Sequence, residues 1–355
     1  MKNKISVRQV CFILTAYGAA TKLLLYPTDA AHAVGNALIF SSLFNLILQS
    51  VIIWSVSYLS SRTDKTFFEL LNNTFGNVAA RVIYFLFGLY FLIAAIVPLE
   101  EQQLLVHDSF YDTIPSLIVF LPFFVFSVYA GVKTFTNVGR CADIVFPVFI
   151  FCSLAFLIMS VTEADFSNLL PVMAQPFGKV AGYSLSSLFR FSESAFLLMF
   201  MGHYKYKKCD AAKLTVSYVA GGLIVIFIMA SFYSLYGPLT ATRSFAINNI
   251  SVFFPIVNFV GRIDYYIVYM FDAVVLFAIV LNVQMFVHCM CVTFNRDLKI
   301  IYSLCANAAL VAIIIIFNNK FTAVQKFASQ WQWIPAVLFA YLIPVLAWTL
   351  RRKQR

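Results

Sequence analysis

The sequence predicts an all-α, multi-pass membrane protein with ten transmembrane helices. Of its 355 residues, 62% are apolar and only 11% are charged, and the mean hydropathy is +0.87. Soluble domains average about 45–50% apolar and about 25% charged residues, and their surface-to-volume ratio requires a polar exterior. This composition therefore excludes a soluble enzyme, a nucleic-acid-binding protein and a disordered chain.

Ten apolar runs are long enough to cross a bilayer, which requires about 20 mostly apolar residues. They cover residues 6–32, 37–60, 78–106, 114–132, 139–160, 180–202, 211–236, 262–292, 298–317 and 332–350. Lys and Arg are concentrated at the start of the chain, in alternate loops and in the tail 351–355. Because basic loops stay on the cytoplasmic side, we expect both termini to be cytoplasmic. The net charge of +10 then faces the anionic inner leaflet, and no nucleic-acid partner is expected.

The chain divides into two halves of similar plan. A polar segment follows the second span, and another follows the seventh. Each contains a short amphipathic stretch, at residues 67–71 in the first segment and at residues 252–257 in the second. We therefore match a first five-helix repeat, residues 1–161, to a second, residues 180–350, within one membrane domain. Because five is odd, the second repeat is inverted in the membrane. Inverted repeats are typical of secondary transporters, whose binding sites lie near the midplane where helices are interrupted.

The interruptions are predicted in the first and sixth spans, which occupy matching places in the two repeats. In the first span, Gly18–Ala20 permits local unwinding and Pro27 removes a backbone donor. In the sixth span, residues 184–194 contain five serines together with Arg190 and Glu193. Two alternatives stay open, because the small residues can form a close-packing face and serines can bond back to their own helix.

We expect a ligand site where these two interruptions meet. A ligand carboxylate is expected to bind the backbone amides of Gly18, Ala19, Ala20 and Thr21. The half-helix dipole favours an anion there. The amino group and side chain of the ligand are expected to meet Phe189, Ser192 and Glu193.

Charged residues at membrane depth are costly and commonly functional. The candidates for coupling or gating are Lys22, Arg190 and Asp272. Arg190 lies three residues before Glu193, so the two can pair on one helical face, either as a structural pair or in a functional role. Asp272 is expected either to pair with Lys22 across the bundle or to take a proton or a cation.

Other charged residues are expected near the membrane surface. Asp143 follows Arg140 by three residues and is expected to form an interfacial ion pair with it. Asp29 is expected to be solvated at the outer mouth, and Glu100 and Glu101 are expected either to line an outer vestibule or to face water, of which the second is favoured.

Neither a metal site nor an enzymatic centre is expected. The seven cysteines contain no CxxC pair, and the four histidines show no ligand spacing. Paired carboxylates and a nucleophile elbow are also missing from the sequence. We therefore expect no metal, no cofactor and no enzyme activity.

Short motifs are spread along the chain. Ile5-Ser6-x-x-Gln9 precedes Gly18 and Pro27, and the fifth span contains Gly139-Arg140-x-x-Asp143-x-x-x-Pro147. Asn168-Leu-Leu-Pro171 precedes Phe189 and Glu193. In these places, and in length and basic tail, the chain resembles the B subunit of GerA-type spore germinant receptors, within the amino acid–polyamine–organocation transporter superfamily. Asp143 stands where that family more often has Glu, and Lys22 and Arg190 are charges not expected in its core.

The resemblance implies a LeuT-like fold and a role in the spore inner membrane. Such a subunit would bind a small germinant, often an amino acid, in a transporter-like pocket. It would work with an A subunit and a lipoprotein C subunit, and binding would trigger ion release. The alternative is an ion-coupled amino acid transporter of the same superfamily, in which Asp272 or Lys22 couples a proton or Na⁺.

Overall fold

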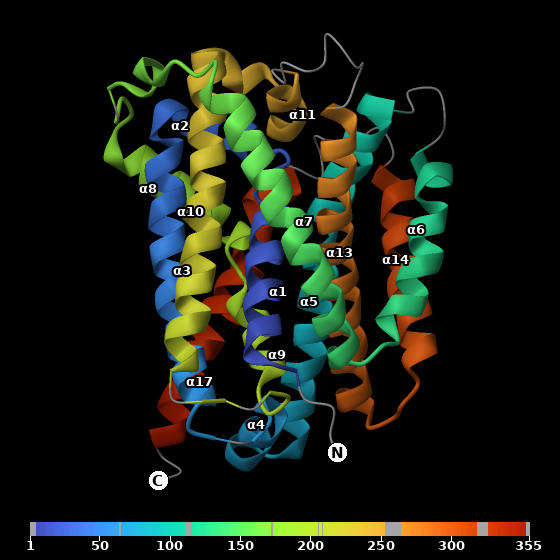
Figure 1. The fold of residues 1–355 in the computed structure, drawn as a ribbon. Coiled ribbons are helices and arrows are strands. Elements are labelled where there is room, and N and C mark those ends of the chain that lie inside the picture. The colour runs from blue at the N-terminus through green and yellow to red at the C-terminus, as the bar shows by residue number, and fades with distance from the viewer. Residues whose placement is uncertain are drawn as a thin grey trace.

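The fold is a bundle of helices that run roughly along one axis, with α1 near its centre (Figure 1). The computed structural model describes residues 5–63, 65–110, 116–171, 173–204, 206–207, 209–252, 264–317 and 326–352. Within these residues the bundle is formed by α1 (Val7–Ala20), α2 (Tyr26–Val34), α3 (Leu38–Ser60), α5 (Asn77–Phe110), α6 (Ser116–Gly131), α7 (Phe135–Val161), α8 (Phe177–Ser186), α9 (Ser194–Phe200), α10 (Asp210–Tyr236), α13 (Asp264–Phe294), α14 (Lys299–Phe317), α16 (Trp333–Ala336) and α17 (Ile343–Arg352).

Each predicted span coincides with one helix or with a group of helices in this bundle. Seven helices of the described chain are long and apolar enough to cross a membrane, and α1 and residues Ile118–Gly131 are shorter apolar helices. Large apolar side chains such as Ile47, Val125 and Ile158 are more than half exposed on the outside of the bundle. An apolar exterior of this kind is suited to contact with lipid. The count of ten spans and the inverted repeat stay predictions.

The structure has both predicted helix interruptions. The first helix ends at Ala20, and residues 21–25 are not helical before α2 begins at Tyr26. Pro27 lies in the first turn of α2, where its missing amide leaves no intrahelical bond unmade. The second interruption follows α8, where a short turn at Ser187–Arg190 leads into three residues, 191–193, before α9.

Backbone groups freed by the interruptions find partners in neighbouring elements. The hydroxyl of Tyr341 donates to the carbonyl of Phe191 at 2.5 Å, and the side-chain amide of Asn45 donates to the carbonyl of Ser184 at 3.0 Å. Serines also bond back to their own helix, as when Ser184 Oγ donates to the carbonyl of Val180 at 2.8 Å. The back-bonding alternative is therefore confirmed together with the interruption. These bonds meet the requirement that backbone polar groups within lipid be satisfied by protein.

The motif residues at the start of α1 meet those in α7 (Phe135–Val161). Ser6 caps α1, and Gln9 completes this capping box. The side-chain amide of Gln9 donates to Asp143 Oδ2 at 2.7 Å, while a side chain at Gly139 would collide with Gln9. The predicted partner of Asp143 is wrong, because Asp143 pairs with Arg8 at 3.0 Å rather than with Arg140. The motif therefore joins the first part of α1 to α7.

Two amphipathic segments were predicted at equivalent places. Residues 67–71 belong to α4 (Phe67–Phe75), which buries Phe67 and Leu71. The other segment, residues 252–257, lies outside the described residues after Val252, and α11 (Ala246–Ser251) precedes it. Figure 1 shows α4 and α11 at opposite ends of the bundle, and α1 begins and α17 ends at the end that carries α4.

Adjacent glycines set the close packing of α10 (Asp210–Tyr236) on two neighbours. A Cβ atom at Gly221 would lie 2.5 Å from Thr15 Cγ2 on α1, and one at Gly222 would lie 2.3 Å from Leu46 Cδ1 on α3. Small residues allow this close approach of helix backbones within a membrane. The first half-helix is therefore fixed in place by α10, which also contributes to the site described below.

We predict that Gly222→Leu destabilises the bundle by about 1–3 kcal/mol, because the added side chain overpacks the contact with Leu46. The measurement is thermal unfolding of the purified protein in detergent. Gly182→Leu on α8 is the matched control, since nothing lies within 4 Å of a Cβ atom there. Equal unfolding temperatures for the two variants would show that the α10–α3 contact is not close-packed.

Candidate functional site

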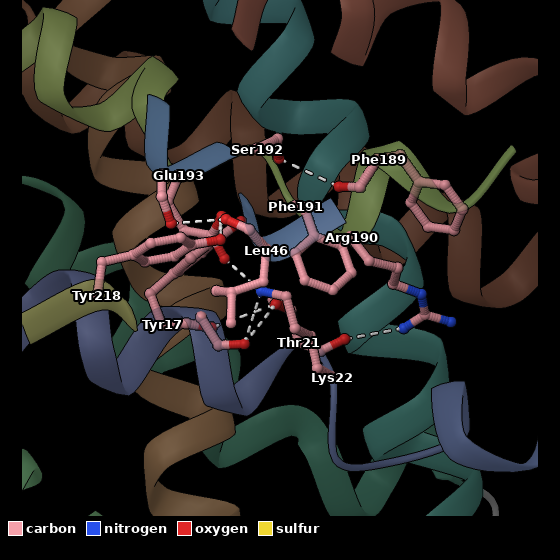
Figure 2. A network of polar contacts seen from close by, with 12 residues as sticks. Tyr17, Thr21, Lys22, Leu46, Phe189, Arg190, Phe191, Ser192, Glu193 and Tyr218 are labelled. Atoms are coloured by element: carbon pink, nitrogen blue, oxygen red, sulfur yellow. Dashed lines mark hydrogen bonds and ion pairs between the residues drawn. The ribbon is translucent and has the colours of Figure 1, made fainter. Parts of the chain in front are cut away.

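The two interruptions lie side by side, so that the end of α1 faces residues 187–193 (Figure 2). The charged residues at this junction come from three parts of the chain. Lys22 follows α1, Arg190 and Glu193 flank the second interruption, and Glu101 belongs to α5. All four are at most 5% exposed. The predicted meeting of the two interruptions is confirmed, and it forms a buried ionic centre.

The ammonium group of Lys22 holds the two interruptions together. It donates to the carbonyl oxygen of Gly18 at 2.8 Å and forms an ion pair with Glu193. It also lies 4.5 Å from the centre of the Phe191 ring, close enough for a cation–π contact. Lys22 is 2% exposed and Glu193 is fully buried. Because a buried charge is stable only when paired, the two side chains depend on each other.

Glu193 is also held by neutral groups from other helices. The hydroxyl of Tyr218 on α10 donates to its second carboxylate oxygen at 3.1 Å. Beside it, the side-chain amide of Gln49 on α3 faces the backbone amides of Glu193 and Ser194. We assign its oxygen to that side, because there it accepts from both amides, at 3.0 and 2.8 Å. Gln49 thereby satisfies amides at the start of α9 that have no partner within the helix.

Arg190 forms the second ion pair. Its guanidinium group makes two hydrogen bonds to the carboxylate of Glu101, one of them 3.0 Å long. It also donates to the carbonyl of Thr21 at 3.0 Å and lies 3.6 Å from Asp29. Two parallel bonds between guanidinium and carboxylate fix the geometry more firmly than one. The first interruption is thus linked to α5 as well as to the second interruption.

Several of the sequence-based expectations about charges are wrong. Arg190 pairs with Glu101 and Glu193 pairs with Lys22, so the expected Arg190–Glu193 pair does not form. Glu101 does not face water, because it is only 1% exposed. Asp29 is not simply solvated, because it lies beside Arg190. The reason for the first error is the interruption itself, which separates residues that a continuous helix would place on one face.

Two further acids lie apart from these pairs. Asp272 on α13 does not pair with Lys22, whose carboxylate partner is Glu193. Asp272 is 6% exposed and Glu100 is 5% exposed, so Glu100 does not face water either. Each has one carboxylate oxygen without a hydrogen-bond partner among the described residues.

The end of α1 presents carbonyls to the site rather than amides. The amide of Thr21 donates to the carbonyl of Tyr17, and the amide of Lys22 donates to the carbonyl of Ala19. The amides of Gly18–Ala20 belong to α1 itself. Their expected role in binding a carboxylate stays a prediction, and it requires this turn to rearrange. A helix C-terminus carries partial negative charge, which suits the two cations that are found there.

The remaining predicted site residues, Phe189 and Ser192, belong to the second interruption. Ser192 Oγ donates to the carbonyl of Phe189 at 3.1 Å. The ring of Phe189 lies 5.1 Å from the guanidinium carbon of Arg190 and points away from Lys22 and Glu193 in Figure 2. Their contact with a ligand stays a prediction.

Little free space is left at the site. A cavity of about 10 Å³ lies beside Gly18, Lys22 and Tyr218, and another of about 20 Å³ lies beside Thr21 and Arg190. A single water needs roughly 10–15 Å³ of such space, whereas small-molecule pockets are typically about 300–1,000 Å³. The structure therefore shows a closed site in which the side chains of the protein satisfy one another.

Sequence reasoning missed Glu101, Tyr218 and Gln49 as parts of the site. Glu101 and Gln49 each carry a weak signal, because they are polar residues within long apolar runs. Tyr218 lies among other polar and small residues of α10 and carries none. Their roles depend on which helices are neighbours, which the spacing along the chain does not reveal.

The fold defines the class of this protein. It is similar to the solved structure of MhsT in complex with L-phenylalanine, with a TM-score of 0.62 and 12% sequence identity, over 98% of this chain and 98% of that one. The chain is thus a helical membrane protein with the fold of MhsT. Residues 4–323 match the family described as spore germination protein, and the chain belongs to that family. A search of curated protein sequences gives no match.

We predict that Lys22→Met lowers the free energy of unfolding by about 3–5 kcal/mol, because Glu193 is left buried without its counter-ion. The double variant Lys22→Met/Glu193→Gln should recover most of this loss, since neither charge remains. Thermal unfolding of the single and double variants measures both effects.

The matched control is Lys213→Met. This residue forms an ion pair with Asp210 at 3.4 Å, and its own side chain is 64% exposed. Asp210 is buried, but it also accepts a hydrogen bond from the amide of Lys207 at 2.6 Å. We therefore expect a loss of about 0–1 kcal/mol, as for exposed pairs. A loss at Lys22 no larger than the loss at Lys213 would contradict the structural role assigned to the buried pair.

Proposed function

We propose that this protein is the ligand-sensing membrane subunit of a spore germinant receptor, and that it binds a small ligand, an amino acid, between the two interrupted helices. The observation that carries the proposal is the buried Lys22–Glu193 pair at the junction of the interruptions. Membership of the spore germination protein family and a transporter fold support it. No enzyme activity is proposed.

An amino acid can replace each half of this ion pair with one of its own charges. Its ammonium group would bind Glu193, and its carboxylate would bind the released ammonium of Lys22 together with amides of residues 18–21. Phe189 and Ser192 would contact its side chain. The exchange leaves no buried charge unpaired, which is the condition that a low-dielectric site imposes.

Binding becomes a signal if the two halves of the bundle take different positions with and without ligand. A ligand shifts such an equilibrium only through its different affinities for the two arrangements. The closed arrangement described above has no room for a ligand, so an amino acid favours the open one. Arg190 and Asp272 are proposed to act in gating or coupling. Arg190 lies at the junction, and Asp272 lies on α13, which contacts α1.

The proposal includes partners and a location. The A-type and C-type receptor subunits would read the change in arrangement, in the spore inner membrane, with both termini of this chain in the cytoplasm. The arrangement that moves would be a 5+5 inverted repeat of ten spans. Support comes from the matching positions of the two interruptions and from the placement of α4 and α11 at opposite ends of the bundle (Figure 1).

The second candidate is an ion-coupled amino acid transporter. One observation favours it: Asp272 is 6% exposed and its Oδ1 has no hydrogen-bond partner among the described residues. A buried carboxylate of this kind is suited to take up a proton or a cation during transport. Both candidates use the same ligand site, so they differ in turnover rather than in binding.

We predict that Gly18→Ala weakens amino acid binding at least tenfold, because the added Cβ would lie 3.0 Å from Glu193 Oε1 and 3.6 Å from Lys22 Nζ. The measurement is the ligand-induced shift in unfolding temperature, screened with amino acids, sugars and nucleosides. Gly182→Ala is the control, because a Cβ atom there meets nothing within 4 Å. An unchanged dose-response in Gly18→Ala, or a response only to sugars or nucleosides, would exclude this amino acid site.

We further predict that the protein alone, in proteoliposomes, does not accumulate a radiolabelled amino acid that it binds. As a receptor subunit it needs only a shift between arrangements, without turnover. Uptake driven by a proton or Na⁺ gradient and abolished by Asp272→Asn would establish the transporter instead. Co-purification with an A-type subunit is the positive test of the receptor.

A further inference from the structure

A larger cavity lies at the end of the bundle that carries α4, away from the ionic centre. Its volume is about 440 Å³, which is within the range of small-molecule sites. Its walls come from five places: Thr66 before α4, the loop between α6 and α7, the residues after α9, the last turns of α13, and the first residue of α14. None of these lining residues is among the predicted binding residues or in the proposed amino acid site.

The charge of this cavity is one-sided. The ammonium groups of Lys133 and Lys299 supply positive charge, the imidazoles of His203 and His288 supply hydrogen-bonding groups, and no carboxylate is found among the described residues of its lining. Lys299 bonds to Asp297 at 3.1 Å, and the side chain of Asp297 is 79% exposed. The cavity therefore favours a negatively charged group.

The two imidazole rings are held in place by an aromatic partner. The ring of Phe135 lies 5.0 Å from that of His203 and 4.8 Å from that of His288, and the two imidazoles are 5.6 Å apart, measured between ring centres. Packed rings fix the positions of polar atoms that would otherwise move. Both imidazoles thus form a stable wall rather than a mobile surface.

Two long helices begin at the same cavity. Thr134 is the N-cap of α7 (Phe135–Val161), and its side chain makes no capping hydrogen bond. Lys299 is the first residue of α14 (Lys299–Phe317). Helix N-termini carry partial positive charge and unpaired amides, so both add to the attraction exerted by the basic side chains.

Lys133 and Lys299 make only weak contacts with other side chains. The ammonium of Lys133 lies 3.8 Å from the ring centre of Tyr129, and Lys299 takes part in the solvent-exposed pair with Asp297. Exposed cation–π contacts and surface ion pairs are weak. A charge-assisted bond to an oxyanion is stronger than either, so a bound anion can draw both ammonium groups into the cavity.

We propose that this cavity, lined by Lys133, His203, His288 and Lys299, is a second ligand site that binds an oxyanion, either a phosphate or a carboxylate. It adjoins the start of the first interrupted segment, just before α1, and the end of the second, just after α9. Gly202 packs on Thr66, and the carbonyl of His203 accepts a hydrogen bond from the amide of Ile5, just before α1, at 3.1 Å.

The test is a titration of the purified full-length protein with inorganic phosphate, in uncharged detergent and at constant ionic strength set with chloride. Isothermal calorimetry and thermal unfolding should show saturable binding. Lys133→Gln and Lys299→Gln should each weaken it about tenfold, which corresponds to the loss of one charge-assisted bond, and the double variant should abolish it. Lys179→Gln, which removes an exposed lysine on α8, should bind like the unmodified protein.

The source of the anion is distinguished by repeating the titration in nanodiscs. If phosphate binds in phosphatidylcholine but is competed out in an equimolar mixture with phosphatidylglycerol, the ligand is a lipid headgroup; equal binding in both indicates a soluble anion. Absence of saturable phosphate binding would overturn the proposal. So would a double lysine variant that binds phosphate as tightly as the unmodified protein and unfolds at the same temperature in chloride. Neither result depends on the amino acid site, which Gly18→Ala tests separately.

Discussion

Four buried charges, paired across the junction, hold the two interrupted helices together where they meet. Lys22 binds Glu193, Arg190 binds Glu101, and each cation also takes one carbonyl from the end of α1. The interruption and the ion pairs require each other: ending the helix frees the carbonyls of Gly18 and Thr21, and the cations satisfy them. A continuous first helix would leave both cations without these acceptors, at a cost of several kcal/mol for each poorly solvated ion.

The first half-helix is fixed at both ends by polar contacts, because at 14 residues it is too short to cross a membrane by itself. At its start, Ser6 and Gln9 form the cap while Gln9 and Arg8 bind Asp143 on α7. At its end, Lys22 connects it to the second interruption. The motif residues at 5–9 and 139–143 thus position the start of α1, whose other end forms part of the site.

The sequence predicted the interruptions but not the pairing across them. Interruptions are a local property, visible in the serines and charges of residues 184–194 and in Pro27. Pairing is not local: Lys22 and Glu193 are 171 residues apart, and Arg190 and Glu101 are 89 apart. The expected Arg190–Glu193 pair assumed a continuous helix, whereas Arg190 ends a tight turn and Glu193 follows it. The amides of residues 18–21 bond within α1 and its last turn for a related reason, since a helix ends with unpaired carbonyls rather than amides, and their role in binding a carboxylate stays a prediction.

The two ion pairs differ in a way that identifies the one able to open. Arg190 is a planar donor that binds both oxygens of Glu101, a carbonyl and, at longer range, Asp29. Lys22 is a single charge on a flexible stem that binds one carboxylate oxygen, one carbonyl and a ring face. An ammonium group on a flexible stem can turn to a new partner and keep good hydrogen-bond geometry, whereas a guanidinium group must realign both of its parallel bonds. Arg190 and Glu101 therefore form the fixed frame of the site, and Lys22 and Glu193 form the part that a zwitterionic ligand can separate.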